Sequence, residues 1–156
     1  ANGDPARFSD YNLPILADSV TDYPGPLAGV LAGLDWAAEQ GAETIVTAAA
    51  DTPFFPTTLV PRLIEASVGM AHPLVMAATP DVARGRIRHP TFGLWPVALR
   101  DDLRAALGEG LRKVVMWTIR HGGRETLFSE DQTDLFFNVN TPDDLAQARD
   151  LLKDAP

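Results

Sequence analysis

The sequence predicts an α/β fold with a doubly wound, mostly parallel sheet, and three observations support this prediction. Short apolar runs at 13–17, 43–50 and 73–79 have the length of buried strands. Apolar residues at helical spacing occupy the segments between them. The chain has 156 residues, 46% of them hydrophobic and 22% charged, which predicts a single domain over 1–156.

The first half of the chain predicts one strand–helix–strand unit. The runs "LPILA" at 13–17 and "ETIVTAAA" at 43–50 are its strands, and each ends close to an acid. Pro26 is suited to the first position of the helix between them, and Gly41 to its end. Two strands joined by one helix predict a right-handed parallel crossover.

The second half continues the alternation of helices and strands. Thr141 is suited to cap the last helix, and Asp144 to lie near its positive end. The expected helices are 56–68, 97–107, 112–121 and 141–152, and the expected strands are 73–79, 89–96, 125–128 and 135–139.

Charge and composition exclude several classes of protein. The net charge of −8 argues against a nucleic-acid binder, because such proteins present clustered cations to phosphates. No apolar run is long enough to span a bilayer, so no membrane contact is expected. The chain has no cysteine, which excludes a disulfide scaffold and is compatible with the cytoplasm. No Ser-His-Asp set or zinc-ligand spacing is present.

Acids follow two of the predicted strands, at the edge where an open parallel sheet binds its ligands. Asp51 comes directly after the run at 43–50, and the prolines of "TPFFP" hold it at the strand tip. Asp18 follows the run at 13–17, with Asp22 a few residues later. Each carboxylate can accept hydrogen bonds from a ribose or a base. On spacing alone, a helix-capping role is favoured for Asp51, and a plain loop position explains Asp18 or Asp22.

Two amides and a basic loop complete the candidate residues. Asn138 and Asn140 share one face of an extended segment that ends at a helix N-terminus, which suits a polar or anionic group. Turn chemistry explains the two asparagines equally well. Arg84, Arg86 and Arg88 alternate in "ARGRIRHP", where a solvated loop is slightly favoured over a phosphate-facing one.

Four segments together resemble the molybdenum cofactor guanylyltransferase family, also called molybdopterin-guanine dinucleotide synthases. "DYPGPLAGVLAGL", "DTPFFP", "HPTFGLWP" and "FNVNTPDDL" match its signatures in order, and the resemblance runs from Asn2 to the last helix. It implies a Rossmann-like nucleotidyltransferase fold. It also implies that GMP moves from GTP onto the terminal phosphate of molybdopterin, with release of pyrophosphate in the presence of Mg²⁺.

The resemblance also implies roles for individual residues. Asp51 corresponds to the catalytic residue that binds the metal and the nucleotide. The nucleotide side includes Asn2, Asp18, Asp22, Gly25 and Gly29, and the molybdopterin side includes Arg112, Lys113, Asn138 and Asn140. In the loop before the helix, Pro24 and Pro26 restrict φ while Gly25 and Gly29 allow close approach of a nucleotide.

GTP and molybdopterin are the partners expected from the resemblance, together with transient contact with molybdoenzymes or their chaperones. The expected location is cytoplasmic. Two alternatives stay open. One is another nucleotidyltransferase of the same fold, of the cytidylyl or sugar-phosphate type. The other is a non-catalytic carrier of the molybdenum cofactor.

The chain departs from the family's pattern at its start. The family begins with a strand and a glycine-rich loop that cradle the nucleotide phosphates, and Ala1 falls after that segment. We therefore expect the domain to be N-terminally incomplete, with the first strand and the phosphate loop absent. Either the chain is truncated, or the protein has lost catalysis.

Overall fold

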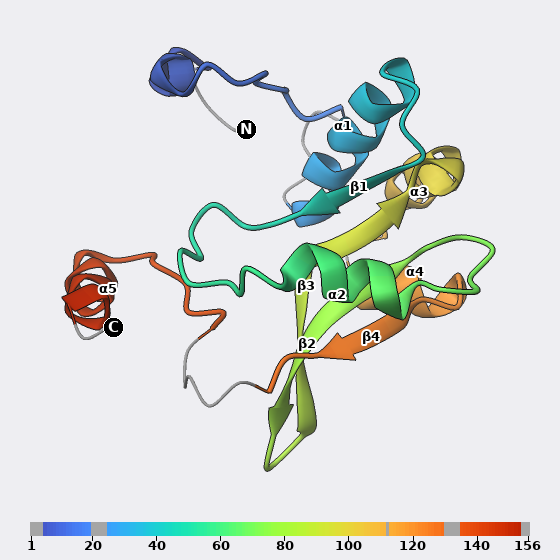
Figure 1. Ribbon diagram of the computed structural model, residues 1–156. Helices are drawn as coiled ribbons and strands as arrows, with labels where there is room; N and C mark the ends of the chain where they lie inside the picture. The colour runs from blue at the N-terminus through green and yellow to red at the C-terminus, as the bar shows by residue number, and fades with distance from the viewer. Residues whose placement is uncertain (1–4, 20–24, 112, 130–134, 154–156) are drawn as a thin grey trace.

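A four-stranded sheet forms the centre of the computed structural model, which describes residues 5–19, 25–111, 113–129 and 135–153 (Figure 1). Its strands follow the order β1-β3-β2-β4. β3 is antiparallel to both β1 and β2, and β4 is parallel to β2. The prediction of a mostly parallel sheet is therefore confirmed, because all strands except β3 run in one direction. The strands are β1 (Thr44–Thr47), β2 (Val75–Asp81), β3 (Gly85–Pro96) and β4 (Arg124–Leu127).

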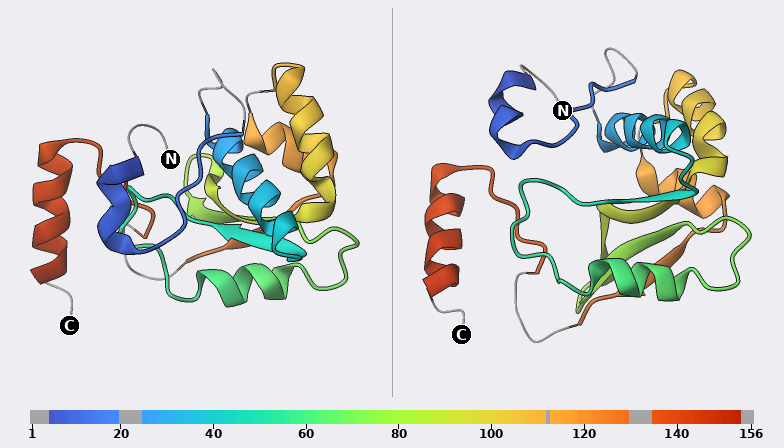
Figure 2. Two further views of the ribbon diagram at one scale, coloured as in Figure 1. Left: turned by 90° about the horizontal axis from the view of Figure 1, so that it is seen from above. Right: turned by 45° about the horizontal axis from the view of Figure 1, so that its top comes forward.

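Helices cover both faces of this sheet, as predicted for a doubly wound fold. Figure 2 shows α1, α3 and α4 on one face and α2 on the other, while α5 stands away from the sheet. None of the helices in the described ranges is long and apolar enough to cross a membrane. The helices are α1 (Pro26–Glu39), α2 (Leu59–Ala66), α3 (Arg100–Gly108), α4 (Val114–Arg120) and α5 (Pro142–Lys153), with 3-10 helices η1 (Pro5–Tyr11) and η2 (Val97–Leu99).

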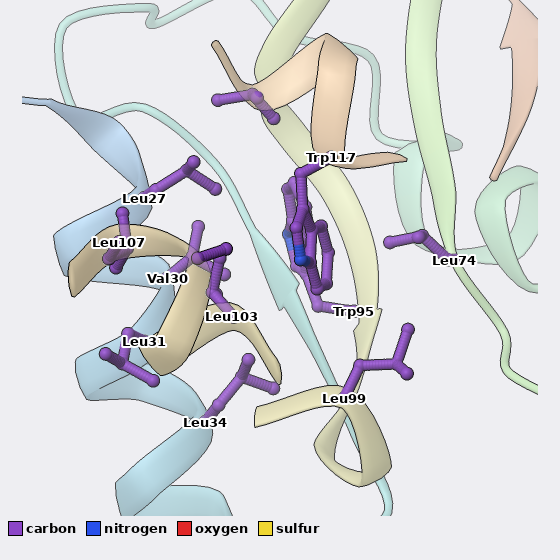
Figure 3. Close-up of a cluster of buried hydrophobic side chains, with 12 residues drawn as sticks. Leu27, Val30, Leu31, Leu34, Leu74, Trp95, Leu99, Leu103, Leu107 and Trp117 are labelled. Carbon is purple, nitrogen blue, oxygen red and sulfur yellow. The ribbon is translucent and has the colours of Figure 1, made fainter. Parts of the chain in front are cut away.

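The larger core lies between the sheet and the three helices α1, α3 and α4 (Figure 3). Trp95 from β3 and Trp117 from α4 are at most 1% exposed, and their ring centroids are 6.3 Å apart. Leu27, Leu31 and Leu34 recur at helical spacing along α1 and pack into the same cluster. Each such side chain contributes about 1.5–3 kcal/mol when fully buried, so this cluster fixes α1 on the sheet.

A second core lies under α2 and uses the opposite face of the same strands. Leu94 belongs to this cluster, while its neighbour Trp95 points to the other one, because successive side chains of a strand alternate between faces. Leu63 from α2 and Phe92 from β3 are both buried in it. The helix and the sheet are thereby held together.

Two of the predicted strands are wrong, at 13–17 and 135–139. Both segments are irregular, and neither belongs to the described sheet. Leu13 is 70% exposed, so the run at 13–17 is not a buried strand. The predicted crossover between this run and the strand at 43–50 is consequently wrong as well. An apolar run becomes a strand only where a neighbouring strand pairs with its backbone groups. The other predicted elements are present, with shifted boundaries.

Candidate active site

Asp51 lies in the loop after β1, beside the segment that leads into α5 (Figure 1). The Val139 amide donates a 2.7 Å hydrogen bond to the Asp51 carbonyl. The hydroxyl of Thr52, which is 1% exposed, lies 2.8 Å from Asn138 Oδ1 and 3.2 Å from Asp51 Oδ1. The structure therefore brings together Asp51 and Asn138, two of the predicted site residues.

Thr52 was not among the residues predicted from the sequence. Only its position next to Asp51 could have indicated a role in the site. That position is weak evidence, because threonine is common in proline-rich turns. Its importance comes from a contact with Asn138, 86 positions away, which local sequence patterns do not reveal.

Asn140 lies where the irregular segment enters α5. Asp144 Oδ2 accepts the backbone N–H groups of Asn140 at 3.0 Å and Thr141 at 2.8 Å, and the Asp144 amide donates to Thr141 Oγ1 at 3.2 Å. This is a capping box, and the hydrogen bond from the Asn140 backbone is the main cause of a lowered pKa of Asp144. The Asp144 carboxylate therefore binds the two backbone amides that precede α5, and the Thr141 hydroxyl binds one amide of its first turn. The exposed side chain of Asn140 has no hydrogen-bond partner among the described residues.

A groove with a volume of about 410 Å³ opens between α1 and the segment that precedes it. Asp18 Oδ1 lies 4.0 Å from the position that a Cβ atom would take at Gly29. Because Gly29 has no side chain, the groove reaches the backbone of α1 beside this carboxylate. Ala50 also lines the groove, so the groove adjoins Asp51. Its walls are otherwise mainly apolar, with Tyr11, Leu13, Pro14, Ile15, Leu16, Ala32 and Gly33 among the lining residues.

The other predicted residues are not joined to this site by any contact in the described structure. Gly25 precedes α1 in an extended conformation, and an added Cβ would meet no atom within 4 Å. Lys113 is exposed at the start of α4, and its ammonium group has no ion-pair or hydrogen-bond partner in the described part of the chain. Asn2, Asp22 and Arg112 lie outside the described residues.

Two of the three alternating arginines are bound within the protein. Arg86 Nη1 and Arg88 Nε contact the Glu125 carboxylate on β4 at 2.7 and 2.6 Å. Burial raises the pKa of Glu125, but hydrogen bonds from Arg88 and Arg86 outweigh it and leave the pKa lowered. These two guanidinium groups therefore link β3 to β4 through Glu125. Neither forms a hydrogen bond or an ion pair with Asp51, Thr52 or Asn138 in the described structure.

The oxygen atoms around Asp51 suit a hard divalent cation. No group of three or more His, Cys, Asp or Glu side chains that could hold a metal occurs among the described residues. Mg²⁺ commonly binds through one or two carboxylates and completes its shell with water and substrate phosphates. The partly buried Asp51 carboxylate fits such a site, with the Asn138 amide oxygen as a neighbouring acceptor.

Comparison with known proteins identifies the domain and its relatives. Residues 1–123 match the MobA-like NTP transferase domain. The chain is 47% identical over 159 residues to a molybdenum cofactor guanylyltransferase from Rhodopseudomonas palustris, a match that covers 100% of this chain and 72% of the relative. A protein of the same name from Mesorhizobium japonicum is 50% identical over 158 residues, covering 98% of this chain and 74% of the relative.

Solved structures agree with this assignment at the level of the fold. Molybdopterin-guanine dinucleotide biosynthesis protein A from Archaeoglobus fulgidus aligns with a TM-score of 0.70 and 21% identity, over 96% of this chain and 73% of that one. A putative protein from Aquifex aeolicus aligns with a TM-score of 0.68 and 18% identity, over 88% of this chain and 68% of that one. Because the domain match spans most of the chain and the sequence relatives are close to half identical, this chain belongs to the MobA-like NTP transferase family.

Proposed function

We propose that the protein is a nucleotidyltransferase that moves GMP from GTP onto the terminal phosphate of molybdopterin and releases pyrophosphate. The observation that carries the proposal is the convergence of Asp51, Thr52 and Asn138 beside a groove that contains Asp18. This convergence occurs in a chain of the NTP transferase family, whose relatives are named molybdenum cofactor guanylyltransferases.

The reaction brings two anions together, and the site must align them and neutralise their charge. A phosphate oxygen of molybdopterin forms a bond to the α-phosphorus of GTP. The bond from that phosphorus to the bridging oxygen breaks, and pyrophosphate leaves with the electron pair. Mg²⁺ bound at Asp51 would neutralise phosphate oxygens and the leaving pyrophosphate. Thr52 fixes the Asp51 carboxylate relative to the Asn138 amide, because its buried hydroxyl contacts both.

The groove beside α1 is the proposed nucleotide side. Its apolar walls suit the flat face of a base, and Gly29 lets a ligand approach the backbone of α1. The Asp18 carboxylate is an acceptor for the N–H groups of guanine or for a ribose hydroxyl. Asn2, Asp22 and Gly25 belong to the same side of the proposal.

The Asn138 and Asn140 amides form the proposed molybdopterin side. A primary amide both donates and accepts hydrogen bonds, as the edge of a pterin ring requires. Arg112 and Lys113 are proposed to face the molybdopterin phosphate, where the Lys113 ammonium, which has no partner among the described residues, supplies charge. Transient contact with molybdoenzymes or their chaperones and a cytoplasmic location complete the proposal.

The decisive experiment follows transfer of labelled phosphate from α-labelled GTP to molybdopterin. It uses the present chain beside a version extended at its N-terminus by the glycine-rich loop of the family, with Mg²⁺ and then with EDTA. Formation of a labelled dinucleotide and of pyrophosphate, dependent on GTP, molybdopterin and Mg²⁺, is the expected result. Transfer only from CTP or only to a sugar phosphate would replace the proposed substrates. Pterin binding without any nucleotide transfer would favour the carrier alternative.

Calorimetric titration with Mg·GTP separates the two parts of the proposed nucleotide site. We expect the extended version to bind and the present chain to bind more weakly, since the family resemblance assigns the phosphate cradle to a glycine-rich loop. Equal binding by both would place the nucleotide phosphates on residues of the present chain alone.

A further inference from the structure

The described segment at 135–140, named the strap, precedes α5 and has no helix or strand structure. No ladder of strand hydrogen bonds fixes it, so its position depends on individual contacts. At one end of the strap, Asn138 and Val139 contact Thr52 and Asp51. At the other end, Phe136 is held by rings from elsewhere in the fold.

The principal ring contact of Phe136 is with His89 on β3. The two rings are stacked, with centroids 3.9 Å apart and an angle of 12° between their planes. His89 Nε2 lies 2.9 Å from the hydroxyl of Thr79 on the neighbouring strand β2. The hydrogen bond to Thr79 on β2 thus fixes the His89 ring, and one face of this ring packs on Phe136 in the strap.

Two fully buried phenylalanines also contact the Phe136 ring. Phe92 and Phe128 are 2% and 1% exposed. Their centroids lie 4.9 and 5.8 Å from that of Phe136, in edge-on arrangements of 75° and 73°. These edge-on contacts fix where Phe136 sits, and the His89 stack covers its face.

The state of the His89 ring suits this stack. Burial lowers the pKa of His89, so the ring is neutral at neutral pH. A neutral imidazole can pack on an aromatic face and still exchange one hydrogen bond with a hydroxyl. In the described part of the chain, no charged side chain forms a hydrogen bond or an ion pair with this ring.

We infer that His89 is a positioning residue for Asn138, acting through the stack on Phe136. The inference deepens the proposed function and rests on it only for its activity readout, because Asn138 is the proposed contact to molybdopterin. Among the described residues, His89 has no hydrogen bond or ring contact with Asp51, Thr52 or Asn138, and it is not among the residues that line the groove. Its effect reaches the site along the strap, from Phe136 to Asn138 two positions later.

The first test needs no substrate and measures hydrogen exchange at the Val139 amide, which donates to the Asp51 carbonyl. Loss of the stack and of the Thr79 contact in His89→Ala is expected to speed exchange in the strap by roughly tenfold. His89→Phe keeps a ring on Phe136, so exchange should stay within about threefold of the wild-type rate. His72→Ala is the matched control, since His72 is an exposed histidine, and it should leave exchange unchanged.

Unchanged exchange at Val139 in a folded His89→Ala variant would overturn the inference. If His89→Ala does not fold, Thr79→Val replaces it, because this variant removes the hydrogen bond and retains the histidine ring. It should speed exchange in the strap by about threefold, and wild-type exchange in Thr79→Val would count against the inference.

The second test separates positioning from general destabilisation. In the version extended by the glycine-rich loop of the family, His89→Ala should raise KM for molybdopterin about tenfold and leave KM for GTP within about threefold. His89→Phe should restore most of the loss. Equal increases in both KM values, in proportion to the fall in thermal stability, would reduce His89 to a packing residue. If the wild-type protein transfers no GMP at all, the proposed function fails while the exchange result still decides the role of His89 in the strap.

Discussion

The hydroxyl of Thr52 lies 2.8 Å from the amide oxygen of Asn138, although the two residues are 86 positions apart in the sequence. The same hydroxyl lies 3.2 Å from the Asp51 carboxylate. One neutral and buried side chain therefore sets the spacing between the proposed metal ligand and the proposed pterin contact. The geometry of the site depends on a residue that has no charge and no expected contact with either substrate.

Thr52→Val tests this dependence, because valine keeps the shape of threonine and lacks the donor. We expect a loss of about 1 kcal/mol in the free energy of unfolding, since Asp51 and Asn138 are accessible enough for water to replace the lost hydrogen bond. We expect kcat/KM for GMP transfer to fall roughly tenfold as the two groups lose their fixed spacing.

Thr52→Ser is the matched variant, since it keeps the hydroxyl and loses a buried methyl group. It should lose about 0.8 kcal/mol of stability and retain nearly all of its activity. Denaturant unfolding and transfer kinetics on both variants supply the comparison. Equal activity in the valine and serine variants would remove the hydroxyl from the mechanism.

Asp51→Ala should retain the fold and lose turnover. The side chain is partly exposed, and its backbone carbonyl, which accepts the Val139 amide, is unchanged by the substitution. Removal of a group that stabilises transition-state charge typically costs about 10²–10³ in rate, and we expect a loss of that size. Asp150→Ala in α5 is the control, because that carboxylate is 73% exposed and, among the described residues, pairs only with Lys153. Wild-type turnover in Asp51→Ala would end the assignment of Asp51 as catalytic.

Gly29→Ala should affect stability and function in opposite directions. Gly29 lies inside α1, where alanine is favoured over glycine by about 0.5–1 kcal/mol. The nearest atom to an added Cβ is Asp18 Oδ1 at 4.0 Å, so the protein has room for it. The methyl group would nevertheless enter the groove beside Asp18, where we propose that the nucleotide binds.

We therefore expect a higher melting temperature and a weaker Kd for Mg·GTP in Gly29→Ala, measured by calorimetry. Gly93→Ala is a contrasting variant, since its Cβ would meet the Trp95 ring at 2.9 Å and the Val75 carbonyl at 3.0 Å. It should lower stability. Unchanged affinity in Gly29→Ala would show that the nucleotide does not approach α1 at this position.

The sequence led to candidate residues of the site but not to the contacts between them. Asp51 and Asn138 became candidates because each follows an apolar run in a recognisable motif, and their roles stay predictions. Their connection through Thr52 was not identifiable, because it depends on how two distant segments fold together. The prediction of a strand at 13–17 was wrong for a related reason. Its apolar residues match a strand pattern, but a strand also needs a pairing partner, and in the described structure this run lines the groove instead.

A polar cluster between α3 and α4 leads to a prediction about acid stability. Asp102 Oδ1 accepts a 2.9 Å hydrogen bond from the indole of Trp117 and lies 2.7 Å from His121 Nε2. The hydrogen bond from Trp117 is the main cause of a lowered pKa of Asp102, and His121 adds to it. Trp117 is 1% exposed, so its N–H depends on this carboxylate for a partner.

Because the pKa of Asp102 is lower in the folded than in the unfolded protein, its contribution to stability is present at neutral pH and is lost as pH falls. The loss begins near the unfolded value of about 3.9 and continues through the folded pKa. Asp102→Asn can still accept from Trp117 but does not titrate. Thermal unfolding between neutral pH and pH 3 should therefore show wild type above Asp102→Asn at neutral pH, with the two melting temperatures converging below about pH 4. Asp101→Asn, at a neighbouring side chain that is 79% exposed, should parallel wild type over the whole range. A constant gap between wild type and Asp102→Asn at every pH would mean that the carboxylate's charge contributes nothing and that only its packing matters.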